Sequence, residues 1–201
     1  MTLRAGFLGL LLLAGVAACN REQAPVADAP PSAAVQDLID QRDILAAMDA
    51  LDDAADRKDW TQAQTYFDDD VDVDFSSLGG APGRISAAGL VKNWQDSLSA
   101  DKQSFHMRGG AIVVVDGDSA TVTSHGYAWT RLMSRPVNDL WEVWGVYEHK
   151  LVRRGGQWKI SGLKFVKTYE RGDATIRTTN MAKAVTPPPE AAASVTPPVR
   201  P

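Results

Sequence analysis

Two carboxylates four residues apart are the first side chains in this 201-residue chain that suggest chemistry. Asp52 and Asp56 lie in the stretch "LDDAADRKDW", near the end of a helix predicted over residues 37–58. At about 100° per residue they fall inside or at the edge of the apolar side of that helix. A partly desolvated carboxylate can take part in proton transfer or anchor a ligand. The apolar side that they share consists of Leu38, Ile44, Leu45, Met48, Leu51 and Ala55.

Both carboxylates also have a purely structural interpretation. Asp56 could face solvent beside Arg57 or Lys58, although a negative charge at the end of a helix opposes the helix dipole. Asp52 could be solvated or paired with a nearby cation. The sequence alone leaves both interpretations open.

The other reactive residue types give weaker patterns. The three histidines form no i, i+4 pair and the single cysteine leaves no thiol cluster, so we expect no metal site and no cofactor. The serines lack a G-x-S-x-G nucleophile motif. We expect His149, between Tyr147 and Leu151, to be a satisfied core or interface histidine. A net charge of −4 without a basic patch argues against a nucleic-acid partner.

The N-terminus has the pattern of a targeting segment. An apolar run too short to span a membrane follows "MTLR" and ends at Cys19, the only cysteine. Because "GVAAC" resembles the lipobox of bacterial lipoproteins, we predict a signal peptide over 1–18 and a membrane anchor through lipid on Cys19. Asn20 after the cysteine favours the outer membrane, facing the periplasm, as the location in the cell envelope. An ordinary signal peptide is the alternative.

The rest of the chain divides by composition into a linker, one domain and a tail. Residues 19–35 and 181–201 are rich in Ala and Pro, which is typical of a flexible linker and a disordered tail. Residues 36–180 are long enough for a single core. Within them we predict helices over 37–58, 61–67 and from Ser86, and strands over 71–77, 109–115, 119–133, 140–154 and 157–169. This α-α-β-α-β-β-β-β order predicts an α+β fold.

The predicted strands carry apolar side chains on both faces. In "WEVWGVYEHKLV" one face starts at Trp141, while the other face contains Trp144 and Val146 among charged residues. A sheet that is partly apolar on both faces usually has both faces covered. Helices could cover one face, and a second copy of the chain could cover the other, so we expect a homodimer through the outer sheet face.

Four short stretches in order resemble the nuclear-transport-factor-2-like superfamily. They are "ADRKDW" at 55–60, "VDVDFSS" at 71–77, "SFHMRGG" at 104–110 and "GGQWKISGLK" at 155–164. Within that superfamily the chain is similar to the branch of SnoaL-like polyketide cyclases and scytalone dehydratases. The resemblance implies a cone, in which a curved antiparallel sheet wraps around three N-terminal helices and encloses a pocket.

The resemblance also implies residue roles. In the dehydratase branch an Asp and a His face each other in the pocket, and Asp56 and His106 match them. A backbone-bonded histidine is the alternative for His106. The family's second histidine falls on Arg131, or on Trp129 with a one-residue slip, and a usual tyrosine is replaced by Phe75. These departures argue against dehydratase activity proper.

Three functions follow as hypotheses. The first is binding of a small apolar or aromatic ligand, with Asp56 and His106 as polar anchors. The second is proton transfer by the same pair in an isomerase, cyclase or dehydratase reaction, and the third is a structural or partner-binding role in the envelope. In the first two, the pocket is expected to be lined by Asp52, Phe75, Tyr127, Trp129 and Arg131.

Overall fold

The computed structural model describes residues 30–179, and the predicted lipidation site at Cys19 lies outside them. Helix α1 (Ala33–Arg57) is followed by α2 (Trp60–Thr65), strand β1 (Phe67–Asp74) and a 3-10 turn η1 (Ser76–Leu78). Strand β2 (Gly83–Ser86) and helix α3 (Ala87–Ser97) come next. Four long strands then precede a short helix, in the order β3 (Lys102–Asp116), β4 (Ser119–Leu132), β5 (Leu140–Arg154), β6 (Gln157–Gly172) and α4 (Thr175–Thr178).

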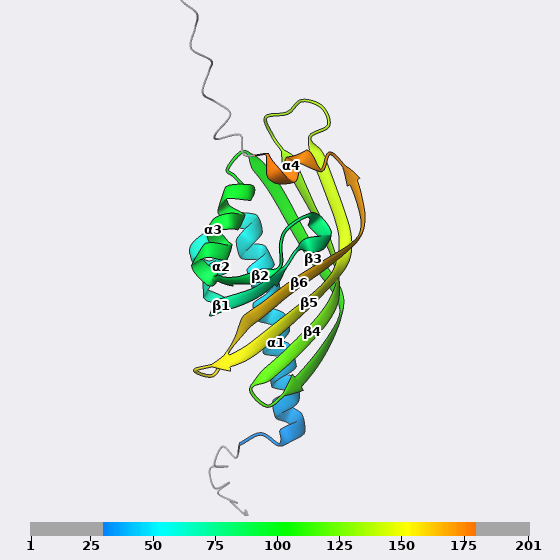
Figure 1. The fold of residues 1–201 in the computed structure, drawn as a ribbon. Helices are drawn as coiled ribbons and strands as arrows, with labels where there is room; N and C mark the ends of the chain where they lie inside the picture. The colour runs from blue at the N-terminus through cyan, green and yellow to red at the C-terminus, as the bar shows by residue number, and fades with distance from the viewer. Residues whose placement is uncertain (1–29, 180–201) are drawn as a thin grey trace, which may run out of the picture.

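The six strands form one curved sheet in the order β2-β1-β6-β5-β4-β3. Helix α1 lies along the concave face, α2 and α3 lie beside it, and α4 lies at one end of the sheet (Figure 1). The predicted α+β cone is therefore confirmed. One strand pair differs from the antiparallel prediction, because β1 runs parallel to β6 and makes the sheet mixed.

Several boundaries follow the sequence signals closely. The β5 strand has its predicted ends, and Ser86 caps α3 through a hydrogen bond from the Gly89 amide at 3.2 Å. Helix α1 ends at Lys58, which takes the left-handed conformation at φ 62° and closes the helix by bonding back to the carbonyls of Ala54 and Ala55. Strand β2 and helix α4, each four residues long, were not predicted.

The first turns of α1 differ from the predicted apolar side. Leu38 is exposed, because the start of the helix extends past the ends of the strands (Figure 1). Asp40 is buried instead, and its carboxylate accepts hydrogen bonds from Arg153 at 2.7 Å and from the Trp158 indole at 3.4 Å. The helix therefore turns carboxylates toward the sheet along most of its length.

Strand β3 begins seven residues before its predicted start and contains a bulge. Its pairing with β4 shifts between Gly109 and Ile112, and Gly110 has φ +61°. A bulge reverses which alternate residues face a given side of a strand. As a result, polar residues before the bulge and Val113 after it both face the helices.

The apolar interior is divided into two clusters. The larger one joins α1, α2 and α3 to the sheet around Ile44, Val122 and Ile160. The smaller one lies near α4 and contains Trp141, Phe165 and Ile176. Two glycines let aromatic rings lie directly against the sheet, because a Cβ at position 126 would be 2.4 Å from the Tyr147 ring and one at 145 would be 2.4 Å from the Phe165 ring. No helix within residues 30–179 is long and apolar enough to cross a membrane.

Candidate functional site

Asp56 on α1 and His106 on β3 form a hydrogen-bonded pair. The Asp56 Oδ1 atom lies 2.7 Å from His106 Nδ1, and Oδ2 accepts the His106 backbone N–H at 2.7 Å. The Ser104 hydroxyl also donates to Oδ1, at 2.9 Å. Three hydrogen bonds therefore hold this carboxylate in one orientation against the strand.

These contacts fix which ring nitrogen of His106 carries a proton toward Asp56. Burial pushes the pKa of the Asp56 carboxyl up, but the hydrogen bonds and charge of His106, with the Ser104 hydroxyl, outweigh it and keep the pKa below its usual value. An ionised carboxylate only accepts hydrogen bonds, so Nδ1 of His106 carries a proton. In the neutral form of the ring, Nε2 therefore carries the lone pair, and no described residue hydrogen-bonds to it. About a quarter of this side chain is exposed (24%), and it lines the cavity described below.

A second pair lies one helical turn away. Asp52 Oδ1 is 2.6 Å from Arg108 Nη2, which also donates to the Met48 carbonyl at 2.5 Å. Only 6% of the Arg108 side chain is exposed. Burial raises the pKa of the Asp52 carboxyl, and the Arg108 charge counteracts that rise. The cation that Asp52 was expected to find is thus a buried arginine two residues beyond His106.

Arg108 also fixes the tautomer of His149 on β5. Its Nη1 lies 2.9 Å from His149 Nε2, and because a guanidinium can only donate, Nε2 must accept. Burial, assisted by the Arg108 charge, lowers the pKa of His149 to about 3, so the ring is neutral and Nδ1 carries its proton. That Nδ1 is buried with no hydrogen-bond partner in the described chain. The predicted core position of His149 is therefore correct, but only one of its two ring nitrogens is satisfied.

A cavity of about 160 Å³ lies between the two apolar clusters, and both pairs reach it. Its apolar walls include Leu51 and Trp94, and the previously predicted Asp52 and Phe75 also line it. Arg177 of α4 lines the cavity near Trp141. Within residues 30–179, no group of three or more His, Cys, Asp or Glu side chains is arranged to hold a metal ion.

Three residues predicted for the pocket lie on the other face of the sheet. Side chains alternate along β4, and Ala128 and Thr130 are the ones that line the cavity. Tyr127, Trp129 and Arg131 therefore point outward. There Tyr127 packs on Trp144 with ring centroids 4.9 Å apart, Trp129 stacks on Phe105 at 6.2 Å, and Arg131 pairs with Asp139.

The sequence analysis missed Arg108, Tyr147 and His149 as site residues. Arg108 is two residues from His106 and would have shared its face if the strand had been extended to Lys102. Tyr147 and His149 were placed on one face of β5, and that face does line the cavity. Burial raises the pKa of the Tyr147 hydroxyl, so this group stays protonated and can donate a hydrogen bond.

The neutral His149 predicts a specific dependence of stability on pH. Its folded pKa of about 3 lies below the ordinary histidine pKa of 6.5, so between these values the unfolded chain binds more protons and acid favours unfolding. This group should lower the free energy of unfolding by about 1.4 kcal/mol per pH unit between about pH 6 and pH 4.5. Urea unfolding of His149→Gln should show that slope reduced. The exposed His125→Gln variant is the matched control, and an equal slope in both variants would contradict a buried neutral His149.

Comparisons with known proteins agree with the fold. The family profile of the SnoaL-like domain matches residues 36–164, and no curated protein sequence matches the chain. The Kfla4162 protein of Kribbella flavida is 25% identical, with a TM-score of 0.67 over 71% of this chain and 99% of that one. A protein of Novosphingobium aromaticivorans that is provisionally named a scytalone dehydratase is 18% identical, with a TM-score of 0.61 over 70% and 91%.

The hexachlorocyclohexane dehydrochlorinase LinA type 2 is 16% identical, with a TM-score of 0.59 over 70% of this chain and 93% of that one. At 18% and 16% identity, the likeness of the last two proteins to this chain concerns the fold alone. The family profile covers well over half of the chain and confirms the SnoaL-like resemblance that the sequence motifs indicated. This protein belongs to the SnoaL-like domain family, within the nuclear-transport-factor-2-like fold.

Proposed function

We propose that this domain transfers a proton on a small ring compound held in the cavity, without a cofactor. One observation carries the proposal: His106 lines an apolar cavity while its Nδ1 lies 2.7 Å from the ionised Asp56. This arrangement leaves the Nε2 lone pair as a base. The proposal takes the second of the three hypotheses and retains ligand binding as its first step.

The proposed step is removal of a proton from a carbon next to a carbonyl group. The C–H bond breaks, an N–H bond forms at His106 Nε2, and the electron pair moves to the carbonyl oxygen as an enolate. Asp56 stabilises the imidazolium that results, since its charge lies against the ring. Return of the proton to a different carbon gives isomerisation, and loss of a leaving group gives elimination.

The size and lining of the cavity limit the substrate. Its volume of about 160 Å³ is close to the roughly 150 Å³ engineered cavity that binds benzene. The walls are mainly apolar, which favours a single ring over an extended polar molecule. Two solved structures of this fold carry names of elimination enzymes, a dehydratase and a dehydrochlorinase, and the fold can therefore house such chemistry.

Hydrogen–deuterium exchange tests the base directly. Cyclohex-2-enone in D₂O should exchange its acidic C–H protons faster with the protein than without it, followed by proton NMR. His106→Ala and Asp56→Asn should each lower the catalysed rate by roughly 10²- to 10⁴-fold, the usual contribution of a positioned acid or base. Arg131→Gln, on the outer face, should retain the wild-type rate.

The outcomes separate catalysis from binding. Exchange that persists unchanged in His106→Ala would contradict the proposed base. A rise in melting temperature with the ring compound, but no exchange in the wild-type protein, would also contradict catalysis and would leave Asp56 and His106 as anchors of a bound ligand.

We also propose that the chain is held at the bacterial envelope by lipid on Cys19. The short apolar run that ends at the only cysteine supports this proposal. In a bacterial host the wild-type chain should fractionate with the outer membrane, and Cys19→Ser should appear in a soluble fraction. A wild-type chain that is soluble, or a Cys19→Ser variant that stays in the membrane, would contradict the lipid anchor.

A homodimer through the outer sheet face is proposed as well. Phe105, Met107 and Tyr169 are exposed on this face, beside the ring of Trp144. Exposed apolar patches of this kind often mark an interface. Trp144→Glu should convert a dimer to monomers in sedimentation velocity, because it would bury a charge between two apolar faces. Val137→Glu in the β4–β5 loop is the matched control, and a wild-type chain that sediments as a monomer would contradict the dimer.

A further inference from the structure

Arg177 brings a positive charge to the cavity from α4, beyond the part of the chain that the family profile matches. Its Nη1 donates to the carbonyl of Leu78, and the guanidinium lies 5.8 Å from the Trp141 ring centroid. The Nε atom is buried without a hydrogen-bond partner. Arg177 therefore uses only part of its hydrogen-bonding capacity inside the protein.

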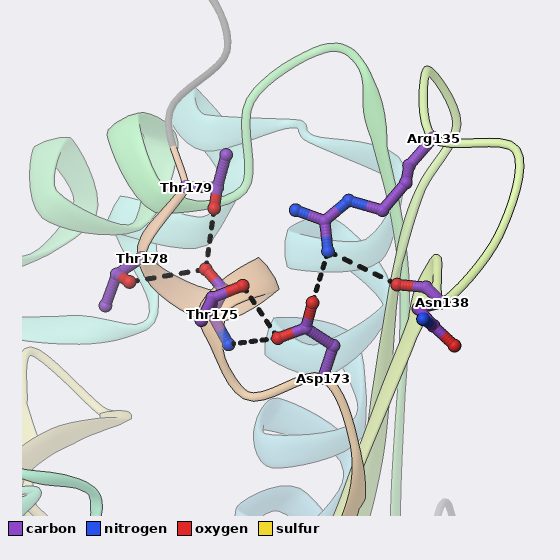
Figure 2. A network of polar contacts seen from close by, with 6 residues as sticks. All are labelled: Arg135, Asn138, Asp173, Thr175, Thr178 and Thr179. Atoms are coloured by element: carbon purple, nitrogen blue, oxygen red, sulfur yellow. Dashed lines mark hydrogen bonds and ion pairs between the residues drawn. The ribbon is translucent and has the colours of Figure 1, made fainter.

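Hydrogen bonds and an ion pair hold the start of α4 in place, so Arg177 has a defined position. Asp173 forms an ion pair with Arg135 and accepts hydrogen bonds from the Thr175 amide at 2.9 Å and the Thr175 hydroxyl at 2.7 Å (Figure 2). On the far side of the helix turn, Ile176 is fully buried in the smaller apolar cluster. The segment is packed as a part of the cavity wall.

No carboxylate in residues 30–179 forms an ion pair with Arg177, although every other cavity-lining charge has a close partner. Arg108 is paired with Asp52 at 2.6 Å. The nearby Glu170 is occupied by Lys167 and by the Trp141 indole. A partly buried cation without a counter-charge is unfavourable, and an anionic occupant would remove that cost.

Buried polar atoms without partners occur on residues that line the cavity. Five buried side-chain nitrogen or oxygen atoms of the described residues have no hydrogen-bond partner. Three of them, on Arg108, His149 and Arg177, belong to cavity-lining residues, and all three are N–H donors. The unused hydrogen-bonding capacity of these lining residues is therefore on donors, and a ligand with acceptor oxygens complements donors.

We propose that the ligand of this cavity is a ring compound with a carboxylate, and that Arg177 binds the carboxylate. This inference rests on the proposed function, since it concerns the same cavity. On the α1 side Arg108 is already paired with Asp52, and Asp56 repels an anion, so the carboxylate takes the α4 side and the ring points toward His106. Strand β4 alone separates β3, which carries His106, from β5, which carries Trp141, a spacing of roughly 10 Å that one substituted ring can bridge.

Isothermal titration of the full chain with benzoate and benzamide tests the inference, because the two probes share shape and differ in charge. Wild-type protein should bind benzoate about tenfold more tightly than benzamide, as expected for a charge-assisted hydrogen bond. Arg177→Gln should bind both equally and keep the wild-type affinity for benzamide. Arg177→Lys, which keeps the charge but loses the planar fork, should retain part of the preference.

Arg131→Gln is the matched control, because it removes the same charge from the outer face and should leave the preference intact. A benzoate preference that survives in Arg177→Gln, or equal binding of the two probes by the wild-type chain, would overturn the carboxylate assignment and leave the proposed function standing. Failure of the wild-type chain to bind either probe would contradict the single-ring ligand of the proposed function and this inference together.

Discussion

The spacing of residues along helix α1 matches the spacing of residues along strand β3, and this match holds the site together. Residues four apart on α1 are separated by about 6 Å along the helix, and alternate residues on β3 by about 6.6 Å along the strand. Asp56 can therefore meet His106 while Asp52 meets Arg108, with the helix running opposite to the strand. A shift of α1 by a single residue would break both pairs. The register of the helix on the sheet is thus set by charge as well as by apolar packing.

The two pairs place two aspartates, Asp52 and Asp56, in different surroundings. Asp56 accepts three hydrogen bonds and its pKa falls, whereas burial dominates at Asp52 and its pKa rises. Asp52 is paired with a permanent cation, whereas Asp56 is paired with a histidine. Pairs of titratable groups that are separated in this way are typical of sites that move protons. Arg108 also contacts His149, so the network of polar contacts extends from α1 across the sheet to β5.

The sequence predicted the helix side of the site better than the strand side. Periodicity placed Asp52 and Asp56 toward the interior, and the family resemblance named His106. The sequence does not reveal Arg108, because the two glycines at 109 and 110 predict the start of a strand, whereas they form a bulge within β3. Tyr127, Trp129 and Arg131 were assigned to the wrong face, since alternation shows that two faces exist but not which one covers the helices. The cavity is bounded there by the small Ala128 and Thr130, and small side chains leave a weak signal in a sequence.

The residues of the site come from two different parts of the chain. Asp52, Asp56, His106, Arg108 and His149 all lie within residues 36–164, the part shared with the SnoaL-like family. Arg177 lies outside it, on a four-residue helix that no periodicity could reveal. Under the proposed function the base belongs to the shared domain and can serve many substrates, and under the further proposal a charge from a peripheral segment selects among them. Because Arg177 lies on α4 and the Asp56–His106 pair lies on α1 and β3, a change in α4 can alter the charge at the cavity while the Asp56–His106 geometry is kept. The reactive pair and the selectivity of the cavity can therefore evolve separately.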